Sequence, residues 1–299
     1  MPMLINEPLA AIPGRTYTAW IPSNPPLATA PVILVFHGGG QETATIARAW
    51  GVVPPGPPPA ALADYIMVFP QTHPELEDRW YTFSFQSVGF PTIDLNYVDA
   101  LLDKLTTRLY PTGAGAVNPQ VTGDPGLVYA SGFSSGGGMV WQMINSPLVA
   151  RLAGAAAVGK PLDVEKAAQY RRSIAPAAPA PIPTFYLQGT ADDGFRAPFL
   201  ADEPDLDTTL PFATLREMFT RNGIAPGPAA TTLVPGSTGV TEVVLQLYAG
   251  GIAAYQHGTV INGGHNWPTP TTVGNPPVAN HFNATESVVE FWRLFAGLP

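Results

Sequence analysis

A serine between two glycines is the feature of this sequence best suited to chemistry. Residues Gly132–Gly136 spell G-x-S-x-G, between the apolar runs Leu127–Ala130 and Met139–Ile144. Strand, tight glycine turn and helix in that order are typical of a nucleophile elbow, where a strained turn presents the serine hydroxyl. The free N–H groups at the helix start suit a developing oxyanion. We predict Ser134 as a nucleophile. The weaker candidates, without a glycine two residues away on both sides, are Ser131 and Ser135.

A serine hydroxyl becomes a strong nucleophile when a base takes its proton and an acid orients that base. Three histidines follow Ser134, and His265 lies in a glycine loop past an expected strand, where its ring can turn toward the serine. His257 falls inside that strand and is predicted to be structural or exposed. His281 directly precedes the closing helix. We therefore predict His265 as the base, with His281 in reserve.

The acid is expected in the loop after the apolar strand Thr184–Leu187, on the same edge of the sheet as the serine. Asp192 and Asp193 both lie there, followed by a glycine. We predict Asp192 as the acid and hold Asp193 second. The alternative interpretation of this pair is turn chemistry, since Asp-Asp-Gly is also a good turn sequence.

A glycine run follows the apolar segment Pro31–Phe36, whose continuous hydrophobicity is typical of a strand buried on both faces of a parallel sheet. The run, His37–Gln41, lies where open α/β sheets bind ligands, and its glycines let the backbone approach one closely. We predict the amides of Gly39, ahead of Gly38, and of Ser135 as oxyanion donors. The alternative is a plain turn, and the histidine of the run is predicted to be a buried structural residue.

Three tryptophans are candidates for contacting a substrate, and each has a core position as its alternative. Trp267 lies two residues past His265, and Trp141 lies in the helix behind the serine. Trp80 belongs to an aromatic segment, Gln71–Gln86, that has no clean period. We predict all three as substrate-binding residues.

The remaining apolar and amphipathic segments alternate along the chain. This pattern predicts one domain spanning residues 1–299, a doubly wound and mostly parallel sheet flanked by helices, with no large separate lid domain. The segment Arg15–Ile21 alternates and ends at a proline, as an edge strand does. Further strands are expected at Tyr65–Phe69 and Leu152–Val158, a hairpin or two final strands at Glu242–Tyr248 and Gln256–Ile261, and helices at Thr92–Tyr110, Val164–Ile174, Leu210–Asn222 (closed by Gly223) and Thr285–Phe295.

Composition excludes several classes of function. The 299 residues are 45% hydrophobic and only 12% charged, with a formal net charge of −8 and no basic stripe, so nucleic acid is not an expected partner. The absence of cysteine excludes disulfides and thiolate chemistry. No metal-binding motif or phosphate loop is recognisable, so neither a metal nor a cofactor is predicted. No run of apolar residues is long enough to span a membrane, and the first residues do not read as a signal peptide.

Four motifs together resemble a known family. HGGGQ, GFSSGGGM, QGTADD and GGHNWP, which extend from His37 to Pro268, look like the α/β-hydrolase esterases of the polyhydroxybutyrate depolymerase and feruloyl esterase branch, related to carbohydrate esterase family one. The resemblance implies an α/β-hydrolase fold and a serine carboxylic ester hydrolase acting through an acyl-enzyme. Its substrates would be short-chain, hydroxycinnamoyl or polyester esters, and its location secreted or periplasmic. By position, it implies a nucleophile, an acid, a base and two oxyanion donors at Ser134, Asp192, His265, Gly39 and Ser135.

Two other functions use the same residues differently. A peptidase, amidase or acyltransferase has the same Ser-Asp-His constellation, but no propeller or lipid-tail signature favours one here. A protein that only binds its ligand is the more remote alternative, since such descendants of hydrolases usually lose the serine or histidine. The sequence leaves the acyl group, the alcohol and the oligomeric state open.

Overall fold

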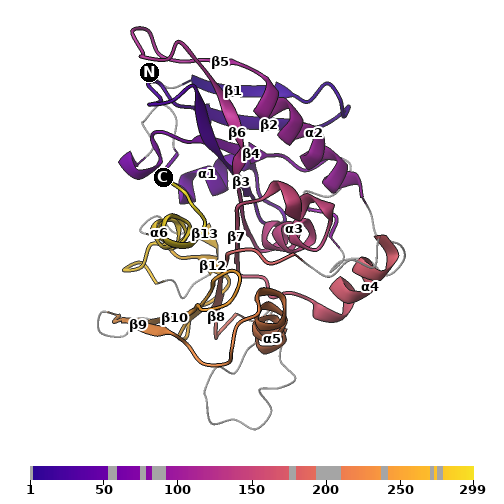
Figure 1. Cartoon of the computed structure of the whole chain (residues 1–299), viewed down its shortest axis with the longest axis vertical. Coiled ribbons are helices and arrows are strands. Elements are labelled where there is room, and N and C mark those ends of the chain that lie inside the picture. Colours follow the sequence, from indigo (N-terminus) through magenta and orange to yellow (C-terminus); the bar gives the residue numbers. More distant parts are fainter. Residues whose placement is uncertain are drawn as a thin grey trace.

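The structure, a computed structural model, describes residues 3–52, 59–74, 79–82, 92–174, 180–192, 210–236, 242–269, 273–274 and 279–299. A large sheet runs through these residues, with helices packed on both faces (Figure 1). The α/β class predicted from the alternation of strands and helices is confirmed, and the described residues contain no separate lid domain.

The strands of the large sheet follow an order in space that differs from their order in the chain. From one edge to the other they are β1 (Met3–Pro8), β2 (Thr16–Ile21), β4 (Ile66–Pro70), β3 (Thr29–Phe36), β6 (Gln120–Phe133), β7 (Gly154–Val158), β8 (Thr184–Gly189), β11 (Tyr255–Val260), β10 (Val243–Tyr248) and β9 (Ala230–Val234); the short β5 (Tyr110–Pro111) pairs with β6. A separate two-stranded sheet consists of β12 (Asn266–Trp267) and β13 (Val273–Gly274).

The strands from β4 to β11 are parallel to their neighbours, whereas the pairs at the two ends of the sheet are antiparallel. Parallel strands bring their carboxyl ends to one edge, which is where open α/β sheets bind ligands. The segments that follow β3, β6, β8 and β11 carry the predicted Gly39, Ser134, Asp192 and His265. The topology therefore collects them at one edge.

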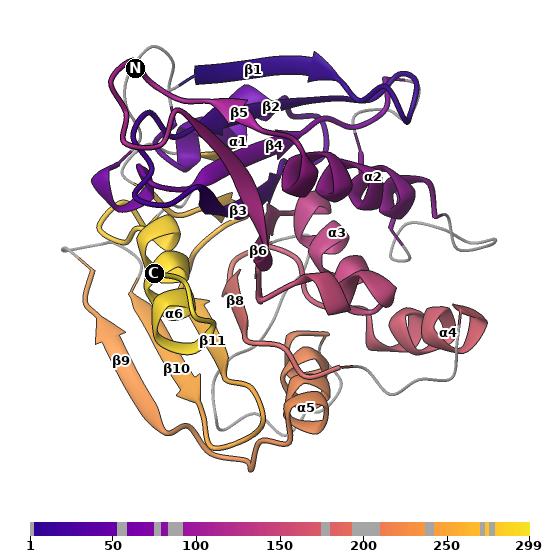
Figure 2. The ribbon, with the colours of Figure 1, turned by 45° about the horizontal axis from the view of Figure 1, so that its top comes forward.

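The helices cover both faces of this sheet (Figure 2). One hydrophobic cluster contains side chains of α2, α3, α4 and α5, and the other contains side chains of α1 and α6. The helices are α1 (Thr43–Ala49), α2 (Ile93–Thr107), α3 (Ser135–Ile144), α4 (Val164–Ile174), α5 (Leu210–Asn222) and α6 (Ala284–Phe295), with 3₁₀ turns η1 (Ala60–Leu62) and η3 (Pro147–Arg151).

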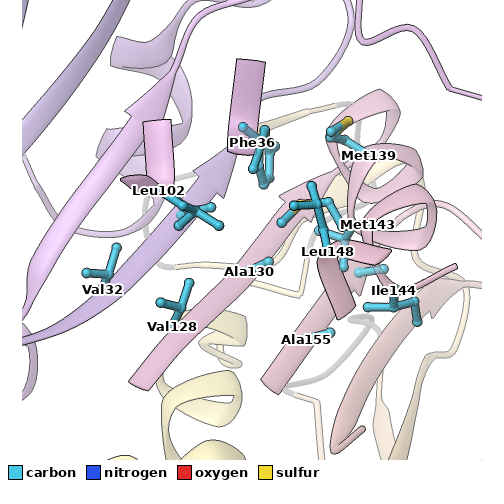
Figure 3. Close-up of a cluster of buried hydrophobic side chains, with 14 of the residues drawn as sticks. Val32, Phe36, Leu102, Val128, Ala130, Met139, Met143, Ile144, Leu148 and Ala155 are labelled. Atoms are coloured by element: carbon cyan, nitrogen blue, oxygen red, sulfur yellow. The ribbon is translucent and has the colours of Figure 1, made fainter. Parts of the chain in front are cut away.

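Strand β3 shows why a buried parallel strand is a continuous apolar run. Val32, Leu34 and Phe36 pack into the cluster on the α2–α5 face, where Figure 3 shows Val32 and Phe36 among the side chains of α2, α3 and β6. The intervening Ile33 and Val35 belong to the cluster on the α1 and α6 face. Because successive side chains point to opposite faces of the sheet, the residues at both odd and even positions of the strand must be apolar. The prediction for Pro31–Phe36 is confirmed.

Strand β6 begins earlier than the predicted Leu127–Ala130. It pairs with β3 through Thr122 and Gly123, loses register, and pairs again from Val128 to Gly132. Pro125 lies in the irregular part, where the missing N–H of proline costs no ladder hydrogen bond. The prediction therefore found the part of the strand that leads directly into the elbow.

The prediction of an edge strand at Arg15–Ile21 is wrong. Strand β2 pairs with β4 on one side and with β1 on the other, so β1 is the outer strand. The sequence of β1, MLINEP, has polar residues and a terminal proline in place of a long apolar run. An outer strand needs no second buried face, which is why the apolar pattern did not reveal it.

Other predicted elements are observed. Helices α4 and α5 have the predicted bounds, and α5 is followed by Gly223 at a positive φ of 64°. Strands β10 and β11 pair antiparallel as a hairpin. In the part of the chain that the structure describes, no helix is long and apolar enough to cross a membrane.

Candidate active site

The turn between β6 and α3 holds Ser134 in a backbone conformation that residues other than glycine rarely adopt. Its φ is 52° and its ψ is −118°, a strained combination that persists where the surrounding structure enforces it. The Ser134 N–H donates to the Val158 carbonyl at 2.9 Å, and its own carbonyl accepts from Gly138 N at 3.0 Å. The turn is therefore held from β7 on one side and from α3 on the other.

The two glycines of G-x-S-x-G lie where a side chain does not fit. A Cβ on Gly132 would lie 2.2 Å from the Gly136 carbonyl oxygen. A Cβ on Gly136 would lie 2.3 Å from the Phe36 carbonyl oxygen at the end of β3. In both cases the obstacle is backbone, which cannot rotate away as a side chain can. The packing thus gives a steric reason for both glycines of the motif.

The structure brings the three predicted residues Ser134, His265 and Asp192 into one hydrogen-bonded row. His265 Nε2 lies 2.8 Å from Ser134 Oγ, and His265 Nδ1 lies 2.6 Å from Asp192 Oδ2. The Asp192 side chain is fully buried, whereas that of His265 is 26% exposed. An Nδ1–H donated to the carboxylate leaves the Nε2 lone pair facing the serine, which is the tautomer that a general base requires.

Packing also fixes the imidazole of His265. The Phe133 ring lies against it, with 4.9 Å between the ring centroids. Gly159 directly follows β7, and a Cβ at this position would lie 3.3 Å from His265 Cε1. The absence of a side chain on Gly159 therefore leaves room for the imidazole ring. The imidazole of His265 is thus held by two hydrogen bonds and by a neighbouring aromatic ring.

The alternative candidates occupy other environments. The Ser135 hydroxyl accepts a hydrogen bond from Trp80 N at 3.3 Å, and Ser131 is buried in β6. His257 is buried in β11 and contacts the Tyr255 hydroxyl at 3.1 Å, as expected of a structural histidine. His281 is exposed before α6. The reserve acid, Asp193, lies outside the described residues.

His257 leads to a prediction about acid stability. Burial lowers its pKa to about 3, whereas a histidine in an unfolded chain has a pKa of about 6.5. Between about pH 6.5 and about pH 3, the unfolded chain binds a proton on this histidine that the native state does not bind. In that window the free energy of unfolding therefore falls by up to about 1.4 kcal/mol for each unit by which the pH is lowered. Above that window its contribution is constant. In urea unfolding over this range, the free energy of unfolding of His257→Gln should fall less steeply with decreasing pH than that of wild type. An identical dependence on pH in the two proteins would contradict this prediction.

The glycine loop after β3 offers one free amide beside one that is occupied. Gly38 N–H donates to Gln41 Oε1 at 3.1 Å, whereas Gly39 N–H makes no hydrogen bond to any described residue. Ser135 is the first residue of α3, and its amide has no carbonyl to bond within the helix. The predicted preference for Gly39 over Gly38 agrees with this pattern, and the assignment of oxyanion donors stays a prediction.

Gln41 belongs to the HGGGQ motif, and its contact with Gly38 indicates that it fixes the conformation of the glycine loop. Gln41→Ala removes the acceptor that fixes the loop, so we expect kcat to fall about 3- to 10-fold, the size of one ordinary hydrogen bond. Steady-state kinetics on the best substrate found measure this. Gln120→Ala, at an exposed site at the start of β6, is the matched control; equal kinetics in the two variants would refute the role.

The prediction that Trp141 and Trp267 contact substrate is wrong. They are 1% and 0% exposed, respectively. The Trp141 indole N–H donates to the Lys160 carbonyl at 2.6 Å. The ring of Trp267 packs against that of Trp50, with 5.8 Å between centroids. Rings that are covered by the core have no surface to offer a ligand, so the core alternative applies.

Trp80 is also buried, at 1% exposure, so its predicted substrate contact is likewise wrong. It instead connects two parts of the site. Its backbone N–H donates to Ser135 Oγ, and its indole N–H donates to the His37 carbonyl at 2.9 Å. His37 is itself buried, as predicted, with Nδ1 2.8 Å from the Gly38 carbonyl. Trp80 therefore fixes the elbow relative to the glycine loop.

Several known structures are similar to this one at low sequence identity. An esterase from the planctomycete Thermogutta terrifontis, solved with propionate bound, is 13% identical with a TM-score of 0.52, and the match covers 97% of this chain and 94% of that one. A puromycin-hydrolysing peptidase from Mycobacterium tuberculosis is 13% identical with a TM-score of 0.50, over 100% of this chain and 40% of that one. A poly(3-hydroxybutyrate) depolymerase from Bordetella parapertussis is 17% identical with a TM-score of 0.47, over 89% and 85%.

No protein-family model and no curated protein matched the sequence. The structural likeness nevertheless shows the α/β-hydrolase fold that the motifs implied. The strand order, the turn after β6 and the loops after β8 and β11 are the parts of that fold which hold the row of Ser134, His265 and Asp192.

Proposed function

We propose that this protein is a serine carboxylic ester hydrolase that works through an acyl-enzyme. The observation that carries the proposal is the position of His265, which lies within hydrogen-bond distance of both Ser134 Oγ and Asp192 Oδ2. A base that already contacts the nucleophile, and is itself oriented by a buried carboxylate, has the geometry that acyl transfer requires. The fold supports the same conclusion, since the Thermogutta terrifontis protein is an esterase.

In the first half-reaction, Ser134 Oγ attacks the carbonyl carbon of the ester while its proton passes to His265 Nε2. Asp192 stabilises the imidazolium that forms through the Nδ1–H hydrogen bond. The tetrahedral oxyanion accepts hydrogen bonds from the amides of Gly39 and Ser135. When the C–O bond breaks, the alcohol leaves with the proton from Nε2, and the acyl group remains on Ser134.

In the second half-reaction, water replaces the alcohol. His265 Nε2 takes a proton from the water, whose oxygen attacks the acyl-enzyme and forms a second tetrahedral oxyanion in the same place. Collapse of this intermediate returns the proton to Ser134 Oγ and releases the acid. Each step uses one proton carrier and one pair of backbone donors, so the two halves need no further group.

For the substrate we propose short-chain, hydroxycinnamoyl or polyester esters, on the basis of the resemblance given by the four motifs. The propionate bound to the Thermogutta terrifontis esterase supports the inclusion of short acyl groups. The test is a hydrolysis panel of p-nitrophenyl esters from acetate to long chains, methyl ferulate and a poly(3-hydroxybutyrate) suspension. Ser134→Ala is the blank.

Adding p-nitroanilides and an acceptor alcohol to the panel also separates the alternatives. Ester turnover that is lost in the blank supports the proposal, and the order of rates along the series defines the acyl preference. Hydrolysis of p-nitroanilides without ester turnover would indicate an amidase, and transfer to an added alcohol in preference to water would indicate an acyltransferase. If a folded wild type is inactive on every substrate, the proposed function is wrong.

A further inference from the structure

A buried glutamine contacts the acid of the Ser134–His265–Asp192 row from behind. Gln188 lies near the end of β8, is 2% exposed, and donates from Nε2 to Asp192 Oδ2 at 2.8 Å. The same carboxylate oxygen is 2.6 Å from His265 Nδ1. A second, weaker contact joins Gln188 Nε2 to the Gly189 carbonyl at 3.4 Å. Asp192 Oδ2 thus faces two donors, Gln188 Nε2 from the end of β8 and His265 Nδ1 from the loop after β11.

A tyrosine sets the orientation of this amide. The Tyr186 hydroxyl lies 3.0 Å from Gln188 Oε1, and because the two residues are two positions apart on β8, their side chains share one face of the sheet. Burial raises the pKa of Tyr186 well above its usual value. The phenol therefore stays protonated and donates to Oε1. A rotation of the amide by 180° would place its N–H groups against this donor and its oxygen against a carboxylate.

We propose that Gln188 is a positioning residue of the catalytic row, fixed in orientation by Tyr186. The inference rests on the proposed function. The amide N–H holds the Asp192 carboxylate so that Oδ2 faces His265 Nδ1, and it replaces part of the hydration that a fully buried carboxylate lacks. Without this donor the carboxylate has more freedom to rotate, and the imidazole spends less time in the orientation that accepts the Ser134 proton.

Two variants and a matched control test these contacts. Gln188→Leu removes all three hydrogen bonds that the glutamine side chain makes, with Asp192, Gly189 and Tyr186, and we expect kcat to fall about 10- to 100-fold with KM changed by about twofold or less. Tyr186→Phe keeps the amide but frees its orientation, so a smaller loss of kcat is expected. The matched control is Thr184→Val on the same strand, whose buried hydroxyl donates to the Ile182 carbonyl at 3.0 Å. It loses a hydrogen bond of β8 without touching the row, so kcat should be unchanged.

Gln188→Glu provides a pH signature that a merely structural role would not produce. The variant carboxyl can donate to Asp192 only while the pair holds a proton, as two adjacent carboxylates do at low pH. Among the described residues, the charged groups that interact with Asp192 are His265 from the loop after β11 and Lys160 from the loop after β7, and both are the same in wild type. The ratio of variant to wild-type rate should therefore rise as the pH is lowered from about 8 to about 6.

The rate to measure is the inactivation of Ser134 by a fluorophosphonate, because it needs no ester substrate. Intact-mass spectrometry follows the labelling, and its concentration dependence separates kinact from KI. Slower kinact for Gln188→Leu at an unchanged KI supports the inference. If wild type itself does not react, the proposed function fails. If wild type reacts and the folded Gln188 variants react equally fast at every pH, the inference alone fails. Should Gln188→Leu not fold, Gln188→Glu and Tyr186→Phe decide the question in the same way.

Discussion

Ser134→Ala is expected to lower kcat by at least about 10,000-fold while the protein stays folded, because the remaining residues cannot form an acyl-enzyme. In the proposed mechanism, the proton leaves Ser134 through the 2.8 Å contact between Ser134 Oγ and His265 Nε2. Alanine keeps the Cβ, so the backbone strain of the turn is the same in both proteins. The melting temperature should therefore change by only a few degrees, as about 1 kcal/mol would produce.

Ser131→Ala is the matched control for this prediction. Ser131 lies three residues earlier in β6, is buried, and its hydroxyl makes no hydrogen bond within the described residues. Its loss should leave both turnover and stability close to wild type. Fluorophosphonate should add mass to wild type and to Ser131→Ala but not to Ser134→Ala. Full activity in Ser134→Ala would assign the chemistry to another residue.

Gly132→Ala and Gly136→Ala are expected to have the largest effect on stability. The added Cβ would lie 2.2 Å or 2.3 Å from a backbone carbonyl oxygen, so β6, α3 or the end of β3 must move. We expect a loss at or above about 3 kcal/mol, the upper end of ordinary overpacking, with little soluble protein as the extreme outcome. Urea unfolding and soluble yield measure this directly.

Gly126→Ala separates this clash from a general cost of replacing glycine in β6. A Cβ at Gly126 has only the Asp124 carboxylate nearby, at 3.3 Å, and the φ of Gly126 is not positive. Its stability should stay near wild type. In any Gly136→Ala protein that folds, the displaced Phe36 carbonyl also moves the glycine loop after β3, so activity should fall more than in a Gly132→Ala protein of equal stability. Wild-type stability in both elbow variants would mean that the turn is not packed in this way.

The sequence by itself determined the parts of this protein that depend on short stretches of chain. A residue in a tight turn between a strand and a helix needs glycine neighbours, so G-x-S-x-G identified the conformation of Ser134 locally. Strand β3 is buried on both faces, so its apolar run was sufficient to place it. His265 and Asp192 were predicted from loops that follow strands, because parallel strands bring their carboxyl ends to a common edge. These predictions needed no knowledge of distant packing.

The tertiary structure alone decided which side chains meet. A tryptophan in a sequence can line a pocket or lie in a core. Trp80, Trp141 and Trp267 are buried because distant segments of the chain pack over their rings. Gln188 was part of a quoted motif, but its contact with Asp192 depends on how the loop after β8 folds back. The choice between Gly38 and Gly39 rests on one hydrogen bond to Gln41. Spacing along the chain fixes the order of such groups, whereas their directions follow from burial and hydrogen bonding in three dimensions.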